Sequence, residues 1–171
     1  RKTEELEALF DLYVEGLNDL SKDERILKNK VKVQVAGRKD LLPERVLAAV
    51  DNVEKVTAEH DNFVFTVCLA YGSREEIIEA VRGIAADHAD GNIDLDGINE
   101  AEISKRLWTG NMPDPDLVIR TSGEERISNF LLWQSAYAEY YFTDVYWPSF
   151  SQGDLFEAIE AYQQRKRRYG E

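Results

Sequence analysis

One short polar turn holds the residues best suited to binding an anion. Residues 120–129 contain two arginines, three hydroxyl side chains and a glycine. Guanidinium groups, hydroxyls and free backbone N–H groups are the donors that a diphosphate needs. The turn follows the apolar run 117–119, and ligands of open α/β sheets sit beyond the carboxyl ends of the strands. Arg120 and Arg126 are therefore candidates for a diphosphate site.

Spacing alone leaves a plainer alternative open. Arg120 and Arg126 could pair with Glu124 and Glu125 in an ordinary surface turn. The sequence contains neither GxxxxGK[ST] nor GxGxxG, the glycine-rich fingerprints of phosphate-binding loops. The residue types point to an anion site, but their pattern does not establish one.

Glu139 is a second candidate because it stands in the aromatic segment 137–142. Aromatic neighbours imply partial burial, and a buried carboxylate needs a cation or a hydrogen-bond partner. Glu139 could bind a hard cation such as Mg²⁺ beside a phosphate, or it could anchor an arginine. It could also face outward from an amphipathic segment. The two histidines, His60 and His88, are expected to be polar surface residues.

Charge and composition exclude several classes of protein. The chain has 33 acidic and 21 basic residues and a formal charge of -12, which disfavours binding to nucleic acids or to anionic membranes. Solubility and a salt-adapted organism explain this acidity equally well. The single cysteine, Cys68, excludes an intrachain disulfide, favours a reducing cytoplasmic location and is expected in the core. No run approaches the ~20 apolar residues of a membrane span, so we expect at most a peripheral membrane contact.

Hydrophobic periodicity in the first half predicts helices that alternate with strands. Seven apolar residues recur every three or four positions, as on one face of a helix. They are Leu6, Leu9, Phe10, Tyr13, Val14, Leu17 and Leu20. Because this helix begins almost at residue 1, we expect the natural N-terminus to be missing. The alternating valines of 31–35 predict a half-buried strand, and a helix is expected from Pro43 to about His60. The apolar run 63–70 predicts a fully buried strand of a parallel sheet.

The second half continues the alternation. Ser73 with Glu76 has the spacing of a capping box and opens a helix, and Asn99 starts a shorter one. The run 117–119 predicts a short buried strand, and Ser151 starts a final helix that leads into the basic tail 165–168. Strands alternating with helices predict an α/β fold with a largely parallel central sheet and flanking helices, as a single domain over residues 1–171.

Several blocks of sequence resemble the cis-prenyltransferases of the undecaprenyl diphosphate synthase family. The blocks that match the family's long C-terminal signature are 116–124, 126–134, 137–139, 142–145 and 147–148. Residues 70–74 are similar to its strand-to-helix turn, and residues 168–170 to its terminal Arg-x-Gly motif. The likeness covers nearly the whole chain and implies an undecaprenyl diphosphate synthase-like fold. The acidity of the chain and the form of the signature at residues 120–124, Arg-Thr-Ser-Gly-Glu, favour an archaeal source.

The resemblance implies a role for individual residues. Arg120 and Arg126 are implied to be catalytic, and Glu139 to take part in Mg²⁺ binding. The implied substrate-binding residues are Arg1, Arg120, Arg126, Ile127, Ser128, Arg168 and Gly170. The implied lining of a product tunnel is Leu9, Leu12, Tyr13 and Phe63, of which the first three could be ordinary core. The basic tail would reach the site of a partner subunit, or it could simply place cations at a helix C-terminus.

The implied activity is condensation of isopentenyl diphosphate with an allylic prenyl diphosphate by a Mg²⁺-dependent, cytoplasmic homodimer. The product would be a long polyprenyl diphosphate of the kind that carries glycans. The family's N-terminal His-x-x-x-Met-Asp-Gly-Asn-Arg-like motif, which supplies the Asp that handles Mg²⁺ and the allylic diphosphate, does not occur in these 171 residues. We therefore expect this polypeptide to be inactive alone. The rival interpretation is a non-catalytic subunit of a heteromeric cis-prenyltransferase.

Overall fold

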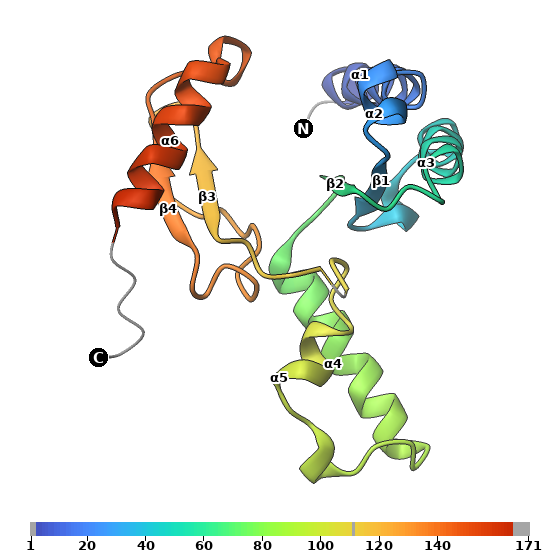
Figure 1. Cartoon of the computed structure of the whole chain (residues 1–171). Coiled ribbons are helices and arrows are strands. Elements are labelled where there is room, and N and C mark those ends of the chain that lie inside the picture. Colours follow the sequence, from blue (N-terminus) through green and yellow to red (C-terminus); the bar gives the residue numbers. More distant parts are fainter. Residues whose placement is uncertain (1–2, 111, 166–171) are drawn as a thin grey trace. The chain divides into compact units, whose positions relative to one another are not determined.

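A computed structural model describes residues 3–110 and 112–165 (Figure 1). The chain divides into two compact units, Arg1–Tyr71 and Gly72–Glu171. The first unit contains α1 (Thr3–Leu20), α2 (Glu24–Lys28), β1 (Val31–Ala36), α3 (Glu44–Val56) and β2 (Phe63–Cys68). The second contains α4 (Ser73–Ala89), α5 (Glu100–Ser104), β3 (Leu117–Arg120), β4 (Glu139–Phe142) and α6 (Gln152–Gln164). Three short 3₁₀ turns occur at Lys39–Leu41, Leu95–Gly97 and Trp147–Ser149.

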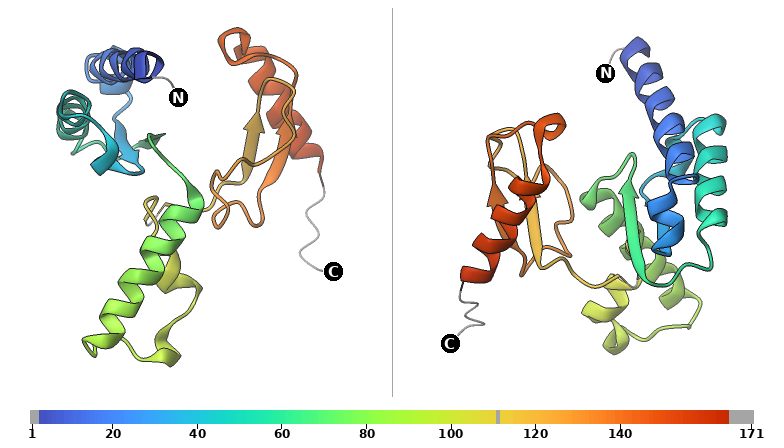
Figure 2. Two further views of the ribbon diagram at one scale, coloured as in Figure 1. Left: turned by 180° about the vertical axis from the view of Figure 1, so that it is seen from behind. Right: turned by 45° about the horizontal axis from the view of Figure 1, so that its top comes forward.

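The core of the first unit lies between its two long helices and β1. Helix α1 contributes Phe10 and Leu17, which pack with residues of α3 and β1. The partners that are buried with them are Val33, Val35, Leu42, Val46, Ala49, Val50, Val53 and Leu69. The two views in Figure 2 show α1 and α3 side by side. The periodicity of the sequence therefore predicted this helical face correctly.

Two side chains at the C-terminal end of α3 accept hydrogen bonds from one edge of β1. The N–H of Val33 donates to Oγ1 of the buried Thr57 at 3.0 Å, and the N–H of Val35 donates to Oε1 of Glu54 at 2.8 Å. On its other edge β1 pairs in parallel with β2, with Val31 opposite Phe63. Both edges of β1 are thus hydrogen-bonded, as backbone groups in a protein interior must be.

The prediction that residues 63–70 form a fully buried strand is wrong. The strand forms, but Phe63 is 57% exposed and Phe65 45% exposed. The reason is that α2 and α3 pack against β1, while β2 pairs with β1 alone among the described strands. Cys68, expected in the core, is only half-buried. The apolar run therefore predicted the strand, but it did not predict whether another element packs over it.

The second unit joins a helical pair to a parallel strand pair. Helices α4 and α5 contact each other, and α6 packs against β4 (Figure 2). Helix α6 begins at Ser151 as predicted, and the N-cap is a full capping box, since the Ser151 and Asp154 side chains each bond to the other's backbone N–H. Asn99 caps α5 as predicted, with its Oδ1 atom accepting from the N–H of Glu102 at 3.1 Å.

The predicted capping box at the start of α4 is wrong. The N-cap residue is Gly72, and Ser73 already lies inside the helix. The hydroxyl of Ser73 donates to the Glu76 carboxylate at 3.1 Å instead of accepting from a backbone N–H of the helix. The spacing of three residues was correct, but burial redirects both side chains, since neither Ser73 nor Glu76 is exposed to solvent.

The α/β class and the parallel pairing of the strands are confirmed. In the described residues the four strands form two parallel pairs, β1 with β2 and β3 with β4. Among those residues, none of the helices has the length and apolar character needed to cross a bilayer.

Candidate anion-binding site

The parallel pair β3–β4 positions the polar turn that the sequence singled out. Arg120, the last residue of β3, is opposite Phe142, the last residue of β4. Beyond the strands, the N–H of Thr143 donates to the carbonyl of Arg120 and the N–H of Gly123 donates to the carbonyl of Thr143, both at 3.0 Å. The turn is therefore fixed at the carboxyl end of the pair, where ligands of such sheets bind.

Gly123 is required by this turn. Its φ of +68° lies in the left-handed region, which glycine adopts without strain. A Cβ atom at this position would also lie 2.9 Å from Oδ1 of Asp144. A side chain here would strain the backbone and would displace the Asp144 carboxylate.

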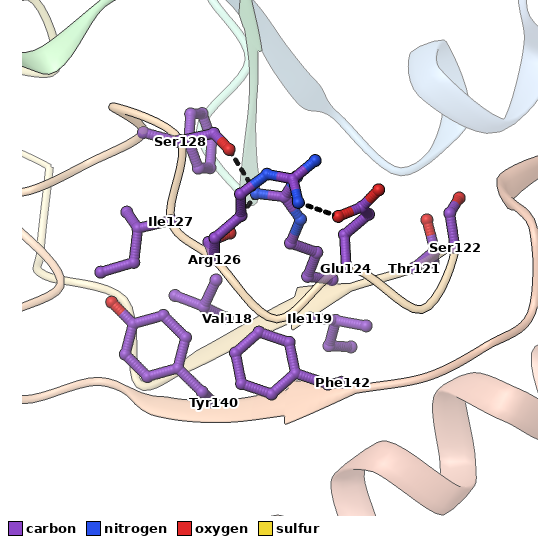
Figure 3. A pocket seen from close by; sticks show the side chains of 12 residues that line it. Val118, Ile119, Thr121, Ser122, Glu124, Arg126, Ile127, Ser128, Tyr140 and Phe142 are labelled. Carbon is purple, nitrogen blue, oxygen red and sulfur yellow. Dashed lines mark hydrogen bonds and ion pairs between the residues drawn. The ribbon is translucent and has the colours of Figure 1, made fainter.

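The turn and the two strands enclose a pocket of about 430 Å³ (Figure 3). Its lining comes from β3, the turn and β4 and consists of Val118, Ile119, Arg120, Thr121, Ser122, Glu124, Arg126, Ile127, Ser128, Phe130, Tyr140 and Phe142. Four predicted substrate-binding residues, Arg120, Arg126, Ile127 and Ser128, thus meet in one cavity. Because all of these elements belong to the second unit, the pocket is defined within that unit.

The Arg120 side chain is hydrogen-bonded to residues 126 and 128, near the C-terminal end of the turn. Its Nη1 atom donates to Oγ of Ser128 at 3.0 Å and also to the carbonyl of Arg126. The guanidinium has more donors than these two bonds use, so it can hold the turn and still donate to an anion. Arg120 therefore fixes Ser128 and the backbone of Arg126 at the pocket.

Arg126 pairs with Glu124 inside the pocket, and Figure 3 shows the two side chains turned toward each other. The plainer alternative considered for this turn, an arginine paired with a neighbouring glutamate, is thus partly correct. The side chains are 64% and 41% exposed, and a solvent-exposed ion pair contributes only about 0–1 kcal/mol. A bound dianion can replace Glu124 at little cost.

An aromatic wall faces the arginines. The rings of Tyr140 and Phe142 stack with their centroids 6.0 Å apart and their planes 13° from parallel. Val118, Ile127 and Phe130 extend this apolar lining. Our sequence reasoning did not assign Tyr140 and Phe142 to the site. Their spacing of two residues, which places them on one face of a strand, is the signal that could have done so.

Glu139 does not line the pocket. It begins β4 opposite Leu117, three residues before Phe142, and its Oε2 atom accepts from Nη1 of Arg165 at 2.6 Å. The interpretation of Glu139 as the anchor of an arginine is confirmed. Within the described ranges, no three His, Cys, Asp or Glu residues are grouped so as to hold a metal ion.

The remaining predicted residues lie elsewhere. Arg1, Arg168 and Gly170 fall outside the described residues. Tyr13 packs against the core of the first unit and Leu9 is half-buried, whereas Leu12 is 63% exposed. Phe63 is exposed on β2, as described above. A tunnel lined by these four residues stays a prediction.

Comparison with known proteins identifies relatives over the full chain. The model of the family described as "Putative undecaprenyl diphosphate synthase" matches residues 1–170. Two archaeal proteins, from Thermoplasma volcanium and Methanopyrus kandleri, are 49% and 51% identical to 99% of the chain. Both are named tritrans,polycis-undecaprenyl-diphosphate synthase (geranylgeranyl-diphosphate specific). The chain spans 66% and 63% of their lengths, slightly less than two thirds.

Two solved structures share this architecture. Lavandulyl diphosphate synthase from Lavandula x intermedia, solved with dimethylallyl diphosphate, has a TM-score of 0.93 and 35% identity. A probable undecaprenyl diphosphate synthase from Campylobacter jejuni has a TM-score of 0.85 and 28% identity. Both likenesses cover the whole chain, together with 73% and 77% of the respective structures.

Proposed function

The chain belongs to the undecaprenyl diphosphate synthase family of cis-prenyltransferases, and on this premise we propose that its pocket binds the diphosphate of isopentenyl diphosphate. The protein that contains it condenses this substrate with an allylic prenyl diphosphate and produces a long polyprenyl diphosphate. The observation that carries the proposal is the meeting of Arg120, Arg126 and Ser128 in one cavity at the carboxyl end of β3.

The two walls of the pocket suit the two parts of this substrate. Arg120, Arg126 and the Ser128 hydroxyl offer charged and neutral donors to the diphosphate. Tyr140, Phe142 and Val118 offer an apolar surface to the five-carbon group. In the transfer, the C1–oxygen bond of the allylic diphosphate breaks, the isopentenyl double bond attacks that carbon, and a proton leaves the new chain. The apolar wall would keep water away from the cationic carbon.

We propose geranylgeranyl diphosphate as the allylic primer. This assignment rests on the names of the archaeal relatives, which specify that primer at 49% and 51% identity. The proposed product is accordingly a tritrans,polycis polyprenyl diphosphate, a precursor of glycan-carrier lipids.

Mg²⁺ is proposed to accompany the diphosphates, since hard oxygen ligands and phosphates are its usual partners. Glu139 has the right donor atoms, but Arg165 occupies one of its oxygens and Glu139 is outside the pocket lining. The described residues therefore do not compose a Mg²⁺ site as they stand. The role of Glu139 in metal binding stays a prediction.

We further propose a cytoplasmic homodimer with at most peripheral contact with a membrane. In such a dimer the tail that contains Arg168 and Gly170 would contribute to the partner's site. The alternative, a non-catalytic subunit, is distinguished by assaying the polypeptide at the full length of its relatives in the absence of any other protein. Turnover by that polypeptide supports the enzyme.

Steady-state kinetics of Arg126→Ala in the same full-length enzyme test the proposed site. Loss of a forked donor to a dianion should raise the KM for isopentenyl diphosphate by about 10²-fold or abolish turnover, with the KM for the allylic primer far less affected. The matched control is Arg82→Ala, which removes an exposed arginine from α4. Wild-type kinetics in Arg126→Ala would remove this residue from the site.

A further inference from the structure

The loop that follows Arg126 has a strained backbone. Ser128, Asn129 and Leu131 have φ values of 52°, 63° and 48°, in the left-handed region that non-glycine residues seldom adopt. Asparagine tolerates this region better than serine or leucine does. Such conformations persist only where surrounding contacts enforce them. Ser128, whose hydroxyl lines the pocket, therefore depends on contacts that hold its neighbours.

Asn129 provides those contacts by joining the loop to the first turn of α4. Its carbonyl accepts from the N–H of Ser73 and its Oδ1 atom accepts from the N–H of Arg74, both at 2.9 Å. Its Nδ2 atom donates to Oε2 of Glu75 at 3.0 Å. The N-cap residue, Gly72, has no side chain with which to cap the helix. Asn129 thus satisfies free N–H groups of a helix distant in sequence.

A buried network fixes the other end of the loop to the same turn. Oγ of Ser73 accepts from the N–H of Leu132 at 2.9 Å and donates to Oε1 of Glu76 at 3.1 Å. The Glu76 carboxylate also accepts from Nε2 of Gln134 and from the N–H of Trp108, each at 3.1 Å. Ser73 and Glu76 are completely buried. Since Glu76 accepts the Ser73 hydrogen, the hydroxyl lone pairs remain directed at the loop.

We propose that Asn129 is a positioning residue for the anion pocket. It is adjacent to Ser128, the hydroxyl that Arg120 contacts, and its three bonds to α4 hold the strained loop in the conformation that directs this hydroxyl into the cavity. Asn129 does not itself line the pocket, so it acts through Ser128. The inference rests on the proposed function, because it assumes that this pocket binds a diphosphate.

The Asn129–Glu75 contact allows a test by exchange of charge. Asn129→Asp keeps the Oδ1 acceptor and the tolerance for left-handed backbone, but it places a carboxylate against Glu75. Adding Glu75→Gln restores a donor to this contact and returns the net charge to that of the wild type. Glu75→Gln alone keeps an acceptor for Asn129 and is the matched single control. Ala80→Gly weakens α4 at a buried position seven residues beyond Ser73 and controls for stability.

The measurement is titration calorimetry of the 171-residue chain with inorganic pyrophosphate, together with a melting curve for every variant. Asn129→Asp should bind about tenfold more weakly, a typical penalty when a supporting contact of a ligand site is lost. The pair Asn129→Asp with Glu75→Gln should recover wild-type affinity, whereas Ala80→Gly should lower the melting temperature without changing affinity. Unchanged affinity in Asn129→Asp, or an equal loss in Ala80→Gly, would overturn the positioning role alone. A wild-type chain that binds no pyrophosphate would overturn the proposed pocket and the inference with it.

Discussion

Arg120 and Ser128, eight residues apart, are joined by a hydrogen bond of 3.0 Å from Nη1 to Oγ. This bond connects the end of β3 to the strained loop that follows Arg126. It places a cation and a hydroxyl side by side at the carboxyl end of the strand pair. In this pair the strand supplies the cation and the loop supplies the hydroxyl.

Removing the Ser128 hydroxyl should weaken binding of a diphosphate without unfolding the protein. Hydrogen bonds to charged groups contribute about 1.5–3 kcal/mol, so Ser128→Ala should lose roughly ten- to hundredfold in affinity for isopentenyl diphosphate. The side chain is exposed, and the melting temperature should change little. Calorimetric titration checks the affinity. An unaltered dissociation constant would show that Ser128 supports Arg120 but does not contact the ligand.

Removing the Glu124 carboxylate should strengthen binding, because Glu124 competes with the ligand for Arg126. An exposed ion pair contributes about 0–1 kcal/mol, so Glu124→Gln should lower the dissociation constant for isopentenyl diphosphate up to about fivefold. Glu125→Gln makes the same change of charge one residue away and separates pairing from net charge. Weaker binding in Glu124→Gln would mean that Glu124 orients Arg126 for the ligand.

Acid should destabilise the α4–α5 contact. Nη2 of Arg106 donates to Oδ2 of Asp87 at 2.6 Å and Nη1 donates to Glu102. These side-chain bonds hold the pKa of Asp87 below its ordinary 3.8 and the pKa of Glu102 below its ordinary 4.5. A carboxylate whose pKa is lowered by folding stabilises the fold at pH values above its pKa in the unfolded state. This contribution is lost as the pH falls through its pKa in the folded state.

We therefore expect the melting temperature to fall as the pH is lowered from about 4.5, with a shallower dependence in Arg106→Gln. Arg82→Gln removes an exposed charge from α4 and should keep the wild-type slope. If the melting temperatures of the wild type and of Arg106→Gln fall equally as the pH is lowered, these ion pairs do not contribute to the acid sensitivity.

Because Phe63 is exposed, Phe63→Ala should change product length without changing stability. Burial would have made Phe63→Ala costly, but the side chain is 57% exposed, and exposed substitutions usually change stability by less than about 0.5 kcal/mol. The expected results are an unchanged melting curve of the 171-residue chain and a longer polyprenyl product of the full-length enzyme. A product distribution identical to that of the wild type would exclude Phe63 from the end of a tunnel.

The sequence predicted the elements better than their surroundings. The periodicity of α1 and α3 identified buried residues such as Leu17 and Val50, because one face of each helix meets the core. The alternation of β1 was equally clear. The run of β2 did not reveal that Phe63 is exposed, since an apolar strand has the same sequence whether or not another element covers it.

The candidate site was predicted in part for a similar reason. Residue types alone pointed to Arg120 and Arg126, because few residues bind diphosphates so well. The contacts of Asn129 with α4 connect residues more than fifty positions apart, and no local pattern reveals such pairs. The pairing of Glu139 with Arg165 across 26 positions was one of the alternatives considered, but its partner could not be named.

The most direct test of the proposed site is a crystal structure of the full-length enzyme with isopentenyl diphosphate alone, which cannot react in the absence of an allylic substrate. We predict that the diphosphate lies at the carboxyl end of β3, with oxygens about 3 Å from the guanidinium groups of Arg120 and Arg126 and from the hydroxyl of Ser128. Its apolar group should lie against Tyr140 and Phe142. A diphosphate bound elsewhere, with the Arg126–Glu124 pair intact and this pocket empty, would contradict the central claim.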